Sequence, residues 1–285
     1  MERDHYRWYN PETDVDALYD LIAPEFAQLH PGITLTPALL AQALSEDPWQ
    51  EHMQEHSNRE LIVVGAEDGS VLDGFVDATL FPAARGVRVM MNGFVCRSKE
   101  AMKKMYTILA YRSRSMGCGM LYYFGKYPFG LGWQGHPEPL KQTHDMLADV
   151  GFQPAGRGQR VIAIDTASIT PQKQAQEEWK QTDNSWSLSI IIDGEAVARC
   201  EAWRVPTWLR NGQYAQWGII QSTQEINDRP GEDWGLEAVM RMAGHLSTQG
   251  ITTLINSVPL EREAFWLELG KPILTTQALE RPLPM

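Results

Sequence analysis

A loop with the composition of an anion-binding site lies at residues 227–237, NDRPGEDWGLE. It joins an apolar run, QYAQWGII, to a run with helical periodicity, LEAVMRMAGHL. Glycines between a strand and a helix let the backbone approach a phosphate, whose charge the N-terminal end of the helix favours. The residues that suit a phosphate are Arg229, Gly231 and Gly235. Glu232 and Asp233 would repel one and are equally suited to cap the helix, so the sequence leaves the role of this loop open.

Other groups that often take part in chemistry have no recognisable arrangement. The chain has neither a nucleophile elbow nor a Cys–His signature. Its three cysteines, Cys96, Cys118 and Cys200, are widely spaced and odd in number, which fits a reducing compartment better than a disulfide framework or a metal site. His52 and His56 are four residues apart, but no third ligand pattern lies nearby, so we interpret them as surface residues.

The N-terminal half alternates predicted strands and helices. Two helices are predicted near the start, in TDVDALYDLIAPEFAQLH and ALLAQALSED. Two strands around a turn at Gly69 and a third strand, GVRVMMNGFVC, follow them. An amphipathic helix, KEAMKKMYTILAYRSRSMG, ends at Gly117. The strand GMLYYFGKY, the helix LKQTHDMLADVGF and the strand QRVIAID complete this half.

The C-terminal half repeats this order after a polar segment, ASITPQKQAQEEWKQTDN. It begins with a hairpin whose turn, Asp193-Gly194, is a strong hairpin signal. A third strand, the loop at 227–237, a helix ending at Gly250, the strand ITTLINSV, the helix EREAFWLELG and a last strand near ILTTQAL follow. Such an internal repeat is strong evidence of architecture. We predict α/β domains at 1–166 and 185–285, joined by a linker at 167–184.

Composition and charge exclude several classes of function. The 285 residues hold 25 basic and 36 acidic side chains, a net charge of −11, which argues against a nucleic-acid partner. No apolar run is long enough to cross a bilayer, and the N-terminus, MERDHYRWYN, lacks the apolar core of a signal peptide. These features predict a cytoplasmic protein with no membrane partner.

The order of elements in both halves resembles the GNAT acetyltransferase fold. The motifs that carry the resemblance are a helix ending in glycine before an apolar strand, and a later helix ending near Gly-Phe. The N-terminal half has RSRSMGCGMLYYF and HDMLADVGF, and the C-terminal half has LSTQGITTLINSV and AFWLELGK. The resemblance covers nearly the whole chain. It implies two GNAT-like domains in tandem, each a mixed, mostly antiparallel sheet flanked by helices.

The resemblance also implies the activity and the cofactor. Family members transfer an acetyl group from acetyl-CoA directly to an amine, without a metal. The strand before the loop contacts the pantetheine arm, and the loop holds the pyrophosphate. Carried onto the second half, these positions are Ile219, Ile220, Gln221, Arg229, Gly231, Trp234 and Gly235. The matching segment of the first half, CRSKEAMKK, has no glycine but carries Arg97, Lys99, Lys103 and Lys104. The second half is therefore preferred for the cofactor.

Acetyl transfer needs a base for the amine, a donor for the oxyanion and a proton for the leaving thiolate. Glu201 on the hairpin and Glu225 beyond the third strand are the predicted bases. Burial among the apolar neighbours of Glu201 would raise its pKa toward the working range, whereas an outward-facing strand position would not. Asp77 is the counterpart in the first half.

The proton donor is less well indicated. Family members often use a tyrosine four residues before the glycine of the final helix, but these positions hold Leu147 and Trp266. An indole N–H is too weak an acid for the role. Tyr127, Tyr122 or Tyr123 could supply a phenol from elsewhere, and water could also protonate the thiolate.

Two other interpretations stay open from the sequence. The altered loops also fit a degenerate, non-catalytic GNAT scaffold that binds a metabolite or a protein partner. A dinucleotide-binding enzyme fits less well, since no G-x-G-x-x-G follows an early strand. The sequence names neither the amine nor the acyl chain, and it leaves a homodimer open.

Overall fold

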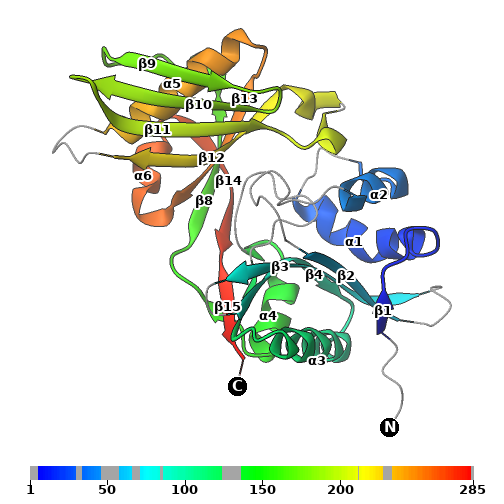
Figure 1. Ribbon diagram of the computed structural model, residues 1–285. Helices are drawn as coiled ribbons and strands as arrows, with labels where there is room; N and C mark the ends of the chain where they lie inside the picture. Colours follow the sequence, from blue (N-terminus) through cyan, green and yellow to red (C-terminus); the bar gives the residue numbers. More distant parts are fainter. Residues whose placement is uncertain are drawn as a thin grey trace. The chain divides into compact units, whose positions relative to one another are not determined.

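The computed structural model describes residues 6–29, 34–45, 58–65, 71–83, 86–123, 136–210, 212–226 and 233–283. The predicted site residues Tyr127, Arg229 and Gly231 and the histidines His52 and His56 lie outside these ranges. The chain divides into two compact units (Figure 1). The first unit comprises residues 1–158 and 275–285, and the second comprises residues 159–274. None of the described helices is long and apolar enough to pass through a bilayer.

The first unit contains a seven-stranded sheet in the order β1-β2-β3-β4-β5-β15-β7. Its elements are β1 (Tyr6–Trp8), α1 (Val15–Leu29), α2 (Pro37–Ser45), β2 (Asn58–Gly65), β3 (Leu72–Ala83), β4 (Gly86–Cys96), α3 (Lys99–Ser115), β5 (Met120–Tyr123), β6 (His136–Pro137), α4 (Lys141–Asp149), β7 (Gln153–Pro154) and β15 (Leu279–Pro282). The β4–β5 pair is parallel, and the other pairs of this sheet are antiparallel.

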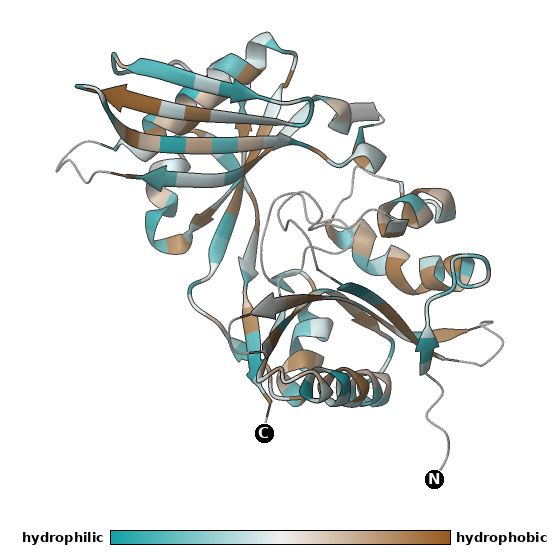
Figure 2. Ribbon diagram, viewed as in Figure 1, coloured by the Kyte–Doolittle hydropathy of each residue, from teal (hydrophilic) through white to brown (hydrophobic). Residues whose placement is uncertain are grey.

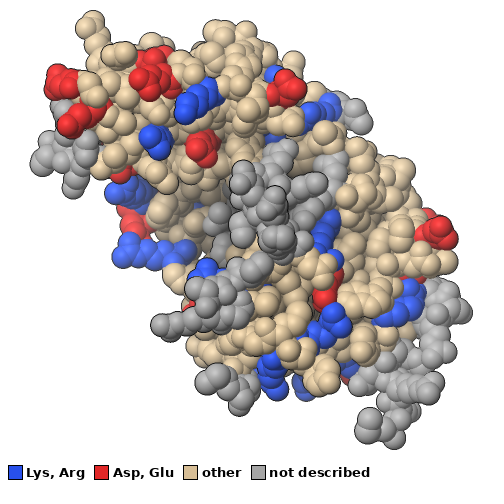
Figure 3. Space-filling model, viewed as in Figure 1, with Lys and Arg blue, Asp and Glu red and all other residues tan. Residues whose placement is uncertain are grey.

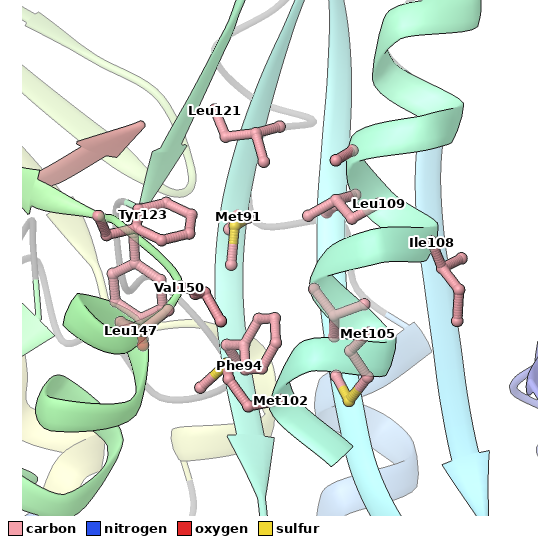
Figure 4. Close-up of a cluster of buried hydrophobic side chains, with 14 of the residues drawn as sticks. Met91, Phe94, Met102, Met105, Ile108, Leu109, Leu121, Tyr123, Leu147 and Val150 are labelled. Atoms are coloured by element: carbon pink, nitrogen blue, oxygen red, sulfur yellow. The ribbon is translucent and has the colours of Figure 1, made fainter. Parts of the chain in front are cut away.

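Helices cover both faces of this sheet: α1 and α2 lie on one face, and α3 and α4 on the other (Figure 1). A core cluster lies between the sheet and α3 and α4, where Met91 and Phe94 of β4 gather with Tyr123 and Leu147 (Figure 4). Apolar residues are concentrated on the strands and on the sheet-facing side of the helices (Figure 2). Burial of these side chains is the main force that orders the unit.

The second unit contributes most of an eight-stranded sheet in the order β6-β14-β8-β13-β12-β11-β10-β9. Its strands and α-helices are β8 (Gln159–Asp165), β9 (Gln176–Gln181), β10 (Ser185–Ile192), β11 (Glu195–Arg204), β12 (Trp217–Glu225), α5 (Trp234–Thr248), β13 (Thr253–Pro259), α6 (Glu263–Trp266) and β14 (Gly270–Gln277). Short 3-10 helices occur at Thr166–Ser168, Thr207–Leu209, Gly212–Gln216 and Leu260–Arg262. Both sheets are mixed and mostly antiparallel, which confirms the predicted fold class.

Local sequence patterns account for several turns and helix ends in the structure. Asp193 and Gly194 both have positive φ, 55° and 82°, as a tight hairpin turn between β10 and β11 requires. Helix α3 begins at the cap residue Ser98, whose hydroxyl accepts from the N–H of Ala101 at 3.1 Å. Gly117 and Gly250 follow α3 and α5 in the left-handed region.

The range 167–184 is not a linker, as the sequence suggested, because it contains the edge strand β9. This strand pairs with β10 from Gln176↔Ile191 to Gln181↔Trp186. Trp179 is half-buried, and the other five residues of β9 are exposed. The strand is therefore polar and resembles a connecting segment in composition. An edge strand that faces solvent lacks the alternation of apolar residues that reveals a half-buried strand.

The boundaries of the units also differ from the predicted 1–166 and 185–285. Strand β8 pairs with β13 over seven residues and belongs to the second unit. Strand β14 continues past residue 274 into the first unit, where Thr276 pairs with Pro137 of β6. Strand β15 then lies between β5 and β7. The end of the chain therefore completes the sheet of the first unit.

Candidate active site

A bulge marks the central strand of the first unit. In the β3–β4 ladder Asp77 is opposite Gly93, but the next residue, Ala78, is opposite Met91. Asn92 is therefore the extra residue of the bulge. A bulge bends its strand and frees backbone groups from the ladder, and bulges are common beside active sites.

The second unit repeats this bulge at the corresponding place. In the β11–β12 ladder Glu201 is opposite Ser222, and Ala202 is opposite Ile220, which leaves Gln221 as the extra residue. Gln221 and Ile220 were both predicted to contact pantetheine. The irregularity therefore falls on predicted cofactor residues.

The two parallel strands of the second unit separate beside this bulge. Strands β12 and β13 pair only from Trp217–Ile219 to Thr253–Ile255. Beyond this point β12 stays with β11 as far as Glu225, and β13 stays with β8 as far as Pro259. The opening exposes backbone groups of β12 that have no partner strand on that side. Such an opening can accept an extended ligand by backbone hydrogen bonds.

The N-terminal end of α5 holds carboxylates of its own chain. Glu225 accepts from the N–H of Gly235 at 3.1 Å, and Asp233 accepts from the N–H of Leu236 at 2.7 Å. A Cβ on Gly235 would lie 3.3 Å from Cγ of Glu225, so glycine permits this close contact. Both carboxylates gain from the helix dipole. The position that the sequence predicted for a pyrophosphate is therefore taken by side chains, and the predicted base Glu225 is a helix cap.

Trp234, the remaining predicted cofactor residue of this helix, is a core residue. Its side chain is 5% exposed and is covered by the Lys173 ammonium, 4.4 Å from the ring centroid. The buried carboxylate of Glu237 accepts from the N–H groups of Gln172 and Lys173. These hydrogen bonds hold the segment around residues 172–173 against the first turn of α5. The sequence gave no signal for this packing, because the partners lie more than sixty residues apart.

Glu201 is exposed on β11, and its nearest polar neighbour is the Ser222 hydroxyl at 3.4 Å. The neighbouring side chains Cys200 and Ala202 are fully buried. Because strand side chains alternate, Glu201 points away from the core, and the burial considered for it from the sequence is absent.

The matching carboxylate of the first unit, Asp77, is fully buried and fully paired. It accepts from Arg59 Nη2 at 2.6 Å and from Asn92 Nδ2 at 2.8 Å. Asn92 also donates to the Thr79 hydroxyl at 2.9 Å. Asp77 therefore fixes the side chain of the bulge residue.

The N-terminal end of α3 differs from that of α5. Its first turn is flanked by the exposed basic side chains Arg97, Lys99 and Lys103, of which Lys99 forms an exposed ion pair with Asp149 of α4. Ser98 caps the N–H of Ala101, and within the described part of the chain no carboxylate accepts from the N–H groups of Lys99 or Glu100. Acidic and basic side chains are otherwise interspersed over the described surface visible in Figure 3. Free N–H groups and adjacent cations together favour an anion.

A further carboxylate of the first unit, Glu25 in α1, was missed by sequence reasoning. Its Oε1 accepts from the Thr143 hydroxyl of α4. Burial raises the pKa of Glu25, and the hydrogen bond from Thr143 opposes this effect. The two residues are 118 positions apart, so only the fold brings them together.

His136 lies in β6, beside Tyr123 and His144. It is 1% exposed, and among the described residues neither ring nitrogen has a side-chain hydrogen-bond partner. Its ring centroid is 5.4 Å from that of Tyr123 and 5.6 Å from that of His144. Burial, with a smaller effect of His144, lowers the pKa of His136 from 6.5 to about 3. The imidazole is therefore neutral at physiological pH.

The depressed pKa of His136 makes the first unit sensitive to acid. The unfolded state takes up a proton near pH 6.5 and the folded state only near pH 3, so stability is present above pH 6.5 and falls as the pH is lowered toward 3. In this range the free energy of unfolding of the wild type should change by up to about 1.4 kcal/mol per pH unit because of His136. We expect His136→Leu to remove this contribution. Urea unfolding at a series of pH values measures it, with His245→Leu in the second unit as the control. An unchanged slope in His136→Leu would contradict the assignment.

Comparisons with known proteins identify the architecture. No family model and no curated protein matches the chain. Among solved structures, the tandem GNAT protein from the clavulanic acid biosynthesis pathway matches with a TM-score of 0.67 at 10% identity, over 99% of both chains. The chain has a tandem GNAT fold.

Two further structures agree with this tandem GNAT fold. A GCN5-related N-acetyltransferase from Sphaerobacter thermophilus matches with a TM-score of 0.63 and 12% identity, over 98% of this chain and 96% of that one. A GCN5-related glucosamine N-acetyltransferase region of a fungal multi-domain protein matches with a TM-score of 0.72 and 11% identity. That match covers 97% of this chain and 38% of the fungal chain. At such identities the likeness concerns the fold, and the chemistry has to be argued from the site.

Proposed function

We propose that the chain is an acyl-CoA-dependent N-acyltransferase that transfers an acetyl group directly to a small amine. The observation that carries the proposal is the opening between parallel strands beside a bulge, at Gln221 in the second unit and with its counterpart at Asn92 in the first. This geometry offers backbone groups to an extended acyl-pantetheine arm. The structural likeness to GNAT acetyltransferases supports acetyl-CoA as the donor.

We propose the first unit as the acyl-CoA site, in contrast to the preference drawn from the sequence. The N-terminal end of α3 has free N–H groups and is flanked by Arg97, Lys99 and Lys103, which suits a pyrophosphate. The N-terminal end of α5 is bonded to Glu225 and Asp233. A phosphate there would displace one carboxylate and be repelled by both.

The alternative keeps the second unit as the cofactor site. It would use Ile219, Ile220 and Gln221 for the pantetheine arm and the loop before Gly235 for the pyrophosphate, and Glu225 would have to leave Gly235. We do not favour this alternative, because carboxylates of the chain itself cap α5. Our second interpretation is instead that the second unit is a scaffold without catalytic activity.

Calorimetric titration with acetyl-CoA distinguishes these possibilities. We expect the wild type to bind and Lys103→Glu to weaken binding about tenfold, since a favourable charge interaction of ~1 kcal/mol is replaced by repulsion. Glu225→Gln, which changes one charge at the N-terminal end of α5, is the matched variant of the second unit and should leave the affinity unchanged.

Each outcome of this titration has a definite meaning. The reverse pattern, with tighter binding in Glu225→Gln and no effect of Lys103→Glu, would assign the cofactor to the second unit. No binding of acetyl-CoA at millimolar concentration by any of the three proteins would overturn the acyltransferase proposal.

A further inference from the structure

Strands β4 and β5 pair only from Val89–Met91 to Leu121–Tyr123, while β4 continues to Cys96, which leaves an opening between the described parts of these strands beside the bulge at Asn92. The contacts of Glu25 point to this opening. Helices α1 and α4 cover opposite faces of the sheet (Figure 1), yet Glu25 of α1 contacts Thr143 of α4. Two side chains can meet across a sheet only where no strand separates them. The charge of Glu25 also contributes to raising the pKa of Cys96 at the end of β4 and of Tyr123 at the end of β5. The contact with Thr143 therefore places the carboxylate beside α4, within electrostatic range of the ends of β4 and β5.

No cation among the described residues is paired with Glu25. Thr143 is its one polar partner among the described residues, whereas Asp77 on the same sheet is paired with Arg59. The neighbouring Cys96 sulfur lies 3.6 Å from the sulfur of Met146, and both side chains are buried. A largely buried carboxylate without a counter-ion is costly unless it is protonated or binds a cation.

We propose that Glu25 is the catalytic base of the first unit and binds the acceptor as a primary ammonium ion attached to a small apolar or aromatic group. This inference rests on the proposed acyltransferase function. Glu25 would attract the ammonium to the opening, where the acyl group of acyl-CoA would arrive from the α3 side. The buried Cys96, Met146 and Tyr123 favour an apolar substituent on the amine.

The chemical step balances without a further residue. Glu25 takes one proton from the ammonium, and the neutral amine attacks the thioester carbonyl carbon. A C–N bond forms and the C–S bond breaks. The nitrogen's second proton goes to the leaving CoA thiolate, which gives the amide, CoA thiol and protonated Glu25. A separate tyrosine acid is not needed, which agrees with Leu147 at the position where family members often have tyrosine.

Burial raises the pKa of the Glu25 carboxyl, whereas the other titratable groups packed nearby are held neutral. Burial raises the pKa of Cys96 to about 12 and raises that of Tyr123 above its ordinary value, so both are neutral. His136, packed against Tyr123, is neutral because its pKa is lowered to about 3. The pKa of Glu25 is raised by burial, so its basic form is gained as the pH rises through this raised value.

The test measures CoA thiol release with acetyl-CoA and benzylamine, tyramine or spermidine as the amine. We expect Glu25→Gln to lower kcat/KM for the best amine by about 100- to 1,000-fold, as is usual for loss of a general base. It should also abolish the rise of kcat/KM with pH on the acid side, while acetyl-CoA binds as in the wild type. Asp20→Asn, an exposed carboxylate on the same helix, is the control and should retain activity.

A second variant separates the chemical role from a structural one. Thr143 is a positioning residue, and its hydrogen bond lowers the pKa of Glu25. Thr143→Val should therefore move the acid limb of the pH profile to higher pH, which a packing defect alone would not do. Wild-type transfer with full activity and an unchanged profile in Glu25→Gln would overturn the role of Glu25 alone. Failure of the wild type to bind acetyl-CoA and to acylate any of the three amines would overturn both proposals.

Discussion

Removal of residues 279–285 is expected to unfold the first unit while leaving the second folded. Strand β15 pairs with β5 on one side and β7 on the other, and Leu279 and Leu283 are buried in the core of the first unit. Arg281 also lies over the Tyr106 ring, 4.1 Å from its centroid. Loss of each buried leucine costs about 2–5 kcal/mol, which together approaches the whole stability of a typical domain.

Hydrogen exchange measured by mass spectrometry can report the two units separately. The amides of α3 should lose protection in the truncated chain, and those of α5 should keep it. Deletion of residues 284–285 alone, which leaves β15 intact, is the control. Full protection of α3 after removal of 279–285 would show that the first unit does not depend on the end of the chain.

Substitution of Asp77 by alanine is expected to destabilise the first unit by about 3–5 kcal/mol, because it breaks a buried ion pair by removing one of its two charges. Arg59, 11% exposed, is an ion-pair partner of Asp77, and Asn92 would lose the acceptor that fixes the bulge. Urea unfolding measures the change. The exposed ion pair between Lys99 and Asp149 in the same unit provides the control, and Asp149→Ala should have no measurable effect.

The double variant Arg59→Met/Asp77→Leu shows whether the cost comes from the unpaired charge. Replacing both partners by apolar residues should recover much of the stability lost in Asp77→Ala, since neither charge is then buried alone. A loss in the double variant as large as that in the single one would contradict this explanation. It would indicate that the hydrogen bonds around Asn92 are the larger contribution.

Much of the fold could be predicted from local patterns. The Asp193-Gly194 turn and the glycines after α3 and α5 act on neighbouring residues, and all occur where the pattern indicated. The repeated order of elements led to the tandem GNAT fold, which the structure confirms. Exceptions were the polar edge strand β9 and helix α6, which is limited to Glu263–Trp266.

The site was less predictable because its residues meet through the tertiary structure. The sequence allowed Glu225 to be a base, but the structure shows it capping α5 through Gly235. The sequence left the facing direction of Glu201 open, and the pleat of β11 turns it outward.

By itself, the sequence determined the elements, the repeat and the fold class, because helix periodicity, strand alternation and turn residues are properties of adjacent positions. Only the tertiary structure decided that the end of the chain completes the first sheet, that α5 is capped by its own carboxylates, and that Glu25 meets Thr143 at the opening between β4 and β5. These contacts depend on strand order, register and burial, which are set when distant segments pack together.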